Sequence, residues 1–153
     1  MKILIVNQKE VAQLISVTEL IPVMEDALKT LARGEAILPQ RPSIWLPDRS
    51  GQLVMMPTYL PNIKAFGLKV ITYFPGNMNS PYDTHQGGVM LFDTTNGNLL
   101  AMIDATEITA NRTAAATGVA SKALARDDSS KLALIGSGTQ ARTHLEALLH
   151  VHD

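Results

Sequence analysis

Short, mostly apolar runs, bounded by polar and turn-forming residues, recur along much of the first hundred residues, a pattern typical of β-strands. Asn96-Gly97 lies between two such runs and predicts a tight hairpin. The segment 74–86 is rich in Pro, Gly, Asn and Ser and predicts a loop. Because most of the runs follow one another through turns, we expect a mostly antiparallel sheet. Its predicted strands cover residues 1–6, 41–46, 53–59, 63–73, 88–93 and 99–104.

Two segments carry helix signals. Ser16–Glu19 has the spacing of a capping box and predicts a helix that runs to about Arg33. Asp104 and Glu107 can cap a second helix, rich in alanine, over about 106–126. The second helix connects the predicted sheet to the last part of the chain.

The last part of the chain combines a short apolar run with a glycine-rich turn. Lys131–Ile135 is followed by Gly136-Ser137-Gly138-Thr139-Gln140-Ala141, a G-x-G-x-x-A pattern, and then by a helical pattern. This order suits the strand, turn and helix that open a dinucleotide-binding fold. Gly136 would permit the tight turn, Gly138 would let the backbone approach a pyrophosphate, and Ala141 would let helix and strand pack closely. An ordinary strand-to-helix turn is the alternative interpretation.

These elements predict a mixed α/β fold in two parts, divided at the polar stretch 127–130. Residues 1–128 are predicted to form an α+β domain of mostly antiparallel strands that binds substrate or forms a dimer. Residues 129–153 are predicted to begin a Rossmann domain, truncated after its first β-α unit. We therefore expect the 153-residue chain by itself to show no turnover.

Composition argues against several classes of protein. The net charge is −1 and no basic block occurs, so we expect no nucleic-acid partner. No apolar stretch approaches the roughly 18 residues that span a bilayer, so we expect no membrane partner. The absence of cysteine excludes disulfides and thiolate metal sites and fits a cytoplasmic protein. Because the histidines lack a zinc-binding spacing, we expect no metal.

Arg112 is the sharpest single candidate for a functional residue. On a helix it shares one face with small apolar residues such as Ile108, Ala115 and Val119. An arginine on that face would be buried, and a buried guanidinium needs an anionic partner. The partner is either a substrate carboxylate, held bidentately, or a protein acid in a fixed ion pair.

Three further positions are weaker candidates. Lys69 lies inside an apolar strand, where it would either act in acid/base chemistry with a lowered pKa or reach the sheet edge as an ordinary lysine. Arg41 stands at the start of a strand, where an exposed charge is common. Thr84–Gly87 lies where a loop becomes a strand, a usual place for binding groups, although a solvated loop is the commoner case.

Taken together, these segments resemble the ornithine cyclodeaminase/mu-crystallin family. The resemblance implies a homodimer that binds a small amino or imino acid, together with a Rossmann domain that binds NAD or NADP. It assigns Arg41, Lys69 and Arg112 to the substrate carboxylate, Lys69 also to proton transfer, and Thr113 and the turn 136–141 to the cofactor. The matching segments are Arg41-Pro42, Met55-Met56-Pro57, Gly67–Val70, Thr84–Gly87, Ile108–Ala115 and the glycine turn.

The implied activity is that of an NAD(P)-dependent oxidoreductase that moves a hydride to or from the α-carbon of the substrate. Reduction of a cyclic ketimine or dehydrogenation of a simple amino acid is the first choice. Conversion of ornithine to proline and ammonia, and a non-catalytic crystallin-like module, are the alternatives. Cyclodeaminases of the family resemble one another in a glutamate at the place of Val54, two residues before Met56-Pro57. The family's catalytic aspartate has no counterpart in this sequence.

Overall fold

The computed structural model describes residues 2–152 and contains a six-stranded sheet with the order β1-β6-β5-β4-β3-β2. Neighbouring strands are antiparallel, except that β1 runs parallel to β6. The predicted mixed α/β fold with a mostly antiparallel sheet is therefore confirmed. Met1, which belongs to the first predicted strand, lies outside the described residues. The strands are β1 Leu4–Val6, β2 Ser43–Trp45, β3 Gln52–Leu60, β4 Ala65–Tyr73, β5 His85–Phe92 and β6 Leu99–Asp104.

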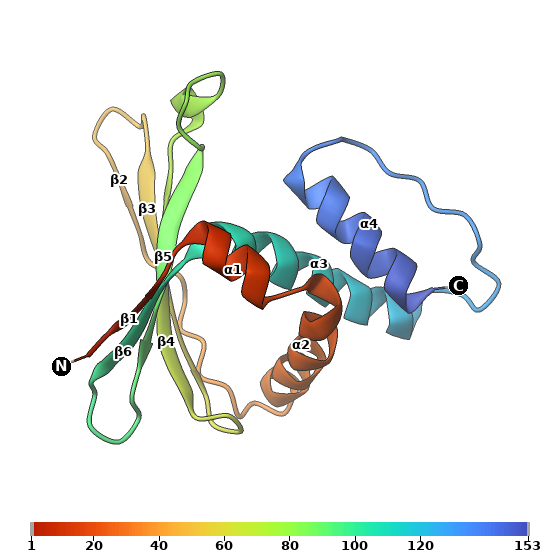
Figure 1. Ribbon diagram of the computed structural model, residues 1–153, viewed down its shortest axis with the longest axis horizontal. Coiled ribbons are helices and arrows are strands. Elements are labelled where there is room, and N and C mark those ends of the chain that lie inside the picture. Colours follow the sequence, from red (N-terminus) through yellow and green to blue (C-terminus); the bar gives the residue numbers. More distant parts are fainter. Residues whose placement is uncertain (1, 153) are drawn as a thin grey trace.

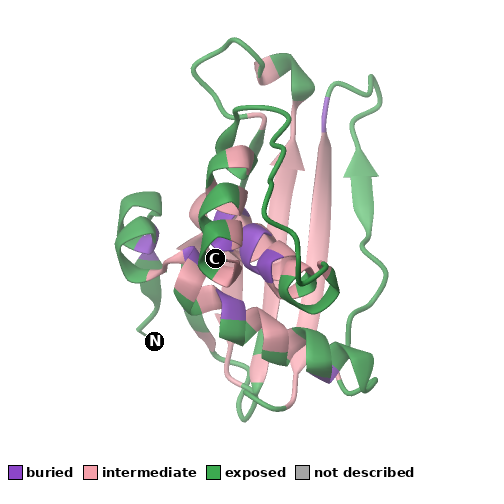
Figure 2. Ribbon diagram, turned by 90° about the vertical axis from the view of Figure 1, so that its right-hand side faces the viewer, coloured by how far each residue is buried: buried purple, intermediate pink, exposed green. Residues whose placement is uncertain are grey.

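The α-helices of the described chain all lie on one side of the sheet (Figure 1). Three of them, α2, α3 and α4, meet in a core of small and branched side chains, and part of the buried surface in Figure 2 lies where these helices meet. The core residues are Val17, Ile21, Ala114, Ala115 and Ala147. Over residues 2–152, no helix is long and apolar enough to cross a membrane. The helices are α1 Gln8–Leu14, α2 Val17–Ala32, α3 Ala105–Leu124 and α4 Thr139–Val151, and a short 3₁₀ helix, η1, covers Pro75–Asn77.

Polar side chains fix where the helices begin. The predicted capping box of α2 is present, with the Ser16 side chain accepting from the backbone N–H of Glu19. Helix α1 was not predicted, although Asn7 and Glu10 form a second capping box at its start. The expected joint capping of α3 is corrected in part, because Asp104 accepts from Thr106 N whereas Glu107 accepts from Gln8 Nε2 at 3.1 Å. Glu107 thus ties α1 to α3.

Strand β5 begins at His85 and not at Gly88, because its first residues continue the ladder with β4. Glycine makes this close pairing possible, since a Cβ atom on Gly87 would collide with the backbone carbonyl of Val70. The end of the predicted loop 74–86 is therefore part of the sheet.

The predicted strand over 131–135 is not formed. These residues carry no strand assignment, and Ile135 is fully exposed. A strand is stabilised by a hydrogen-bonded neighbour, and none of the strands of the described chain lies beside this segment. The helix that follows, α4, lies beside α3 instead (Figure 1). Its residue Ala147 is buried in the core that α4 shares with α2 and α3.

Candidate functional site

Three basic side chains that are far apart in the sequence line one cleft. Arg41 precedes β2, Lys69 lies in the middle of β4, and Arg112 lies on α3. We call this the cationic cleft. It has a volume of about 180 Å³, and its remaining lining residues are Leu38, Pro39, Met56, Pro57 and Thr58.

The alternation of strands and the turn of α3 bring these groups together. Lys69 pairs with Met56 of β3 and with Val89 of β5, so all three stand on the sheet face toward α3. On α3, Arg112 follows Thr109 by three residues, which places the two side chains on one face of the helix. Arg41 is exposed and reaches the cleft from its rim.

Among residues 2–152, no acid forms a salt bridge with the three cations of the cationic cleft. The salt bridges of residues 2–152 are Lys29–Glu25, Arg33–Glu35 and Arg126–Asp128, all outside the cleft. Arg112 was expected to be buried but is only half-buried, because this side of α3 borders the open cleft. The alternative of a fixed ion pair between Arg112 and a protein acid therefore finds no partner within the described chain.

Burial and mutual repulsion shift the pKa values of these groups downward. The pKa of Lys69 falls to about 8, first because burial disfavours its charged form and then because Arg112 and Arg41 repel it. The pKa of Arg112 is lowered by burial and by Arg41. A bound anion would relieve both causes, since it would neutralise the charge and replace lost hydration.

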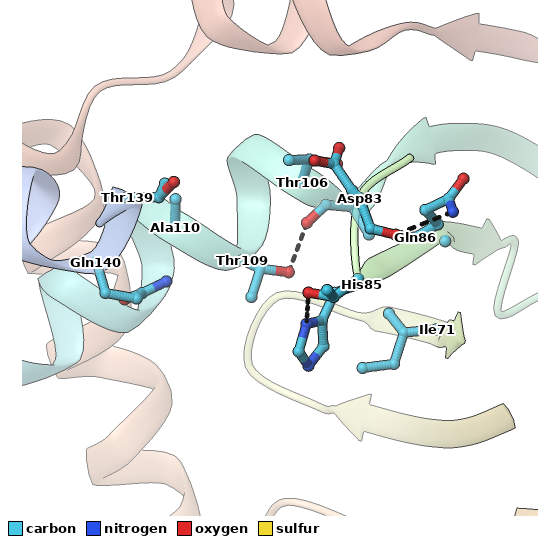
Figure 3. A pocket seen from close by; sticks show the side chains of 12 residues that line it. Ile71, Asp83, His85, Gln86, Thr106, Thr109, Ala110, Thr139 and Gln140 are labelled. Atoms are coloured by element: carbon cyan, nitrogen blue, oxygen red, sulfur yellow. Dashed lines mark hydrogen bonds between the residues drawn. The ribbon is translucent and has the colours of Figure 1, made fainter. Parts of the chain in front are cut away.

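A second cleft of about 380 Å³ lies between the start of β5, the first turns of α3 and the start of α4 (Figure 3). We call it the loop cleft. Asp83–Gly87 contributes one wall, Thr106 and Thr109 the next, and Thr139 and Gln140 the third, while Ile71 of β4 completes it. Its polar lining consists mostly of neutral hydrogen-bonding groups, in contrast to the cationic cleft.

The loop residues are held in place by local contacts. Thr84 Oγ1 and His85 Nδ1 are 3.1 Å apart, and the His85 ring stacks on Tyr73 with centroids 4.6 Å apart. Gln86 Nε2 donates to the Asp83 carbonyl at 3.1 Å. These contacts, some of which are drawn in Figure 3, fix the wall of the loop cleft.

One hydrogen bond joins the two clefts. Lys69 Nζ, which borders the cationic cleft, donates to Oγ1 of Thr109, which lines the loop cleft. The same hydroxyl donates its proton to the carbonyl of Ala105 in the preceding turn. Thr109 was not among the predicted site residues. Its position three residues before Arg112 was the signal that would have found it.

The glycine turn reaches the loop cleft only through its last residues. Gly136 has a φ of 109°, a conformation that glycine adopts most readily, and Gly138 caps α4 without a side-chain hydrogen bond. Thr139 and Gln140 line the loop cleft, whereas Gly136, Ser137, Gly138 and Ala141 do not. The hydroxyl of Thr113, the other expected cofactor residue, donates to the Thr109 carbonyl at 2.6 Å.

The chain is similar in sequence and fold to several known proteins. The alanine dehydrogenase of Archaeoglobus fulgidus is 40% identical over 153 residues, which are 100% of this chain and 46% of that protein. A solved structure of Thermococcus litoralis Delta(1)-pyrroline-2-carboxylate reductase, in complex with NADH and L-proline, is similar with a TM-score of 0.92 and 37% identity. That match covers 98% of this chain and 46% of the reductase.

An archaeal alanine dehydrogenase dimer with bound NAD is similar with a TM-score of 0.92 and 39% identity, over 99% of this chain and 46% of that one. The chain thus spans less than half the length of these relatives. The family model described as the ornithine cyclodeaminase/mu-crystallin family matches residues 1–153. The chain therefore belongs to the ornithine cyclodeaminase/mu-crystallin family.

Proposed function

We propose that this protein carries the substrate-binding part of an NAD(P)-dependent oxidoreductase that moves a hydride to or from the α-carbon of a small amino or imino acid. The observation that carries this proposal is the cationic cleft, where three cations meet and no acid of residues 2–152 lines the site. Reduction of a cyclic ketimine or dehydrogenation of a simple amino acid is the preferred reaction. The names of the similar enzymes, an alanine dehydrogenase and a pyrroline-2-carboxylate reductase, fit both versions.

In this proposal the substrate carboxylate occupies the cationic cleft. Arg112 offers a planar pair of N–H donors to the two carboxylate oxygens, while Arg41 closes the rim. Lys69 supplies a third cation and also exchanges a proton with the substrate nitrogen. A pKa of about 8 suits this second role, because a group that titrates near neutral pH both donates and accepts protons readily.

In the proposal, the start of α4 beside the loop cleft receives the pyrophosphate of a dinucleotide. No side chain caps α4 at Gly138, and the space beside a Cβ at Gly136 and Gly138 is open, so backbone N–H groups there are available to a pyrophosphate. In the proposal, Gly136–Ala141 and Thr113 contribute to holding NAD or NADP, and residues 129–153 begin the nucleotide-binding domain. When bound, the nicotinamide donates or accepts the hydride.

The face of the sheet that points away from the helices supports the proposal of a homodimer. Ile5, Phe66 and Met102 leave 72%, 46% and 45% of their surface exposed, although they are large apolar residues. Exposed apolar surface of this kind favours association with another protein surface. The archaeal alanine dehydrogenase of similar structure is a dimer, so a second copy of this chain is the partner that we propose.

A comparison of substrates tests the proposal. Pyrroline-2-carboxylate, alanine with its keto acid, and ornithine are assayed with NADH, NADPH and their oxidised forms, using the full-length gene product. The proposal predicts nicotinamide-dependent turnover of at least one imino or amino acid, and loss of that turnover when its carboxylate is replaced by a carboxamide. Equal turnover of acid and amide would contradict the assignment of the cationic cleft.

A further inference from the structure

The hydroxyl of Thr109 has no free proton to offer Lys69. A threonine hydroxyl carries one proton and can accept two hydrogen bonds. In this structure the proton is donated to the carbonyl of Ala105 within α3, so Oγ1 meets Lys69 Nζ only as an acceptor. Thr109 therefore offers no proton to the lone pair of a neutral Lys69 amine. The ammonium form of Lys69 donates to Oγ1 in a stronger, charge-assisted hydrogen bond.

The position of this bond gives it a functional meaning. Lys69 comes from the sheet and Thr109 from α3, and they meet where the cationic cleft adjoins the loop cleft. An ammonium group has three N–H donors in a tetrahedral arrangement. Once one of them is fixed by Thr109, the flexible lysine side chain loses its freedom to swing away, and the other two are available to the clefts.

We propose that Thr109 is a positioning residue that holds the amino group of Lys69 at the border of the two clefts and stabilises its protonated form. Burial and then repulsion from Arg112 and Arg41 act in the opposite direction, because they lower the pKa of Lys69. In the proposal, the bond to Thr109 limits this lowering. The consequence for turnover rests on the proposed function. The effect on Lys69 itself rests only on the contacts described.

The test is an NMR titration of the Lys69 side chain in 13C-lysine-labelled protein, with its resonance assigned through Lys69→Arg. Thr109→Val removes the acceptor while keeping the shape of the side chain, and it should lower the pKa of Lys69 by about one unit. Thr109→Ser keeps the hydroxyl and should restore the original value. Thr109→Ala serves as a second variant without the acceptor if the valine variant does not fold.

Thr117→Val is the matched control. The Thr117 hydroxyl donates to the Thr113 carbonyl one turn back, as Thr109 does to Ala105, but it does not contact Lys69. This variant should leave the pKa of Lys69 unchanged. An unchanged pKa in folded Thr109→Val or Thr109→Ala would overturn the proposal, and so would an equal fall in Thr117→Val.

The titration needs neither substrate nor cofactor, so its outcome is independent of the proposed enzyme activity. In the active full-length gene product, the basic limb of the kcat/KM profile should move to lower pH in Thr109→Val and return in Thr109→Ser. A pKa change without this movement would leave Thr109 as the residue that positions Lys69 and would instead count against proton transfer by Lys69.

Discussion

The two faces of the sheet differ in chemistry although the same strands build both. On β4, Lys69 and Ile71 face α3 and border the two clefts, whereas Val70 and Thr72 line a hollow on the opposite face. The first face, on which the helices lie in Figure 1, gathers cations and hydrogen-bonding groups. The second presents exposed apolar side chains. Because side chains alternate along a strand, a shift by one residue would exchange these roles. Register therefore separates the proposed substrate site from the proposed dimer surface.

The largest expected effect is on kcat/KM, which should depend on whether the substrate brings a second positive charge into the cationic cleft. The described lining of the cationic cleft contains no acid. Val54 stands where cyclodeaminases carry a glutamate, and Asp48, the acid that could replace it, accepts hydrogen bonds from Ser50 instead. Burying the distal ammonium of ornithine without an anion would cost several kcal/mol. We expect kcat/KM for pyrroline-2-carboxylate or alanine to exceed that for ornithine by about 100-fold or more.

Steady-state assays of the full-length gene product with competing substrates measure this preference. Efficient release of ammonia from ornithine, with negligible imine reduction, would contradict it and favour a cyclodeaminase. Val54→Glu sharpens the comparison, because it adds an acid to the same face of β3 as Met56 and should move the preference toward ornithine.

Replacing Arg112 tests the cationic cleft directly. Arg112→Ala removes a charge-assisted bidentate contact and should lower kcat/KM by about 2–4 kcal/mol, or about 30- to 1,000-fold. The melting temperature should stay the same or rise, since a repelling cation is lost. Arg126→Ala is the matched control, because Arg126 is exposed and pairs with Asp128. Near-normal kinetics with a lower melting temperature would make Arg112 a structural residue.

A charge on the opposite face should affect assembly. Met102→Asp would bury an unpaired carboxylate in the proposed dimer interface, at a cost of at least about 2 kcal/mol. We expect the dimer dissociation constant to rise by about 30-fold or more in analytical ultracentrifugation. Met78→Asp is the control, because Met78 is also an exposed methionine but lies in the connection between β4 and β5, outside the strands of the sheet. Equal dissociation in both variants would remove the assignment of this face.

The charge of Lys69 predicts how carboxylate binding depends on pH. The lysine is mostly protonated below its pKa of about 8 and loses its charge above it. Affinity for a carboxylate should therefore be highest below pH 8 and fall up to about tenfold as the pH rises through and beyond this value. Calorimetric titrations from pH 6.5 to 9.5 measure the change. Lys69→Met should bind more weakly and lose this dependence, whereas an unaltered dependence would assign it to another group.

The smallest effect is expected at the glycine turn. The 153-residue chain should bind NADH and NADPH only weakly, because it offers a phosphate turn but little to enclose the adenine and nicotinamide. Isothermal titration calorimetry tests this, with Gly138→Val as the variant that should abolish the remaining binding. Micromolar affinity of the unmodified chain would contradict the expectation.

The sequence predicted the elements whose signals are local. Ser16 and Glu19 form their capping box, and short apolar runs between turns located the central strands to within a few residues. The apolar residues of the run 131–135 predicted a strand. No strand forms there, because the described chain provides no neighbouring strand with which it could pair. Helix α1 was missed because seven residues give too little helical periodicity, although Asn7 and Glu10 marked its start.

The sequence predicted single residues of the candidate site but not that they would come together. Arg112 and Lys69 stood out because each interrupts an apolar pattern. Arg41 gave no such signal, and only the family resemblance included it. The meeting of all three depends on the register of β4 and the packing of α3 over it, which no local pattern specifies. Thr109 was missed because its spacing of three residues from Arg112 was not used, and its bond to Lys69 depends on how α3 packs over β4.

The central claim is that the cationic cleft binds the carboxylate of a small amino or imino acid. The most direct test is NMR titration of the 153-residue chain with L-proline and with L-prolinamide, in which a neutral carboxamide replaces the carboxylate. Proline should shift the side-chain resonances of Arg112, Lys69 and Arg41 and raise the pKa of Lys69 from about 8, while prolinamide should do neither. Equal shifts with both ligands, or shifts by proline that leave these three side chains unchanged, would contradict the claim.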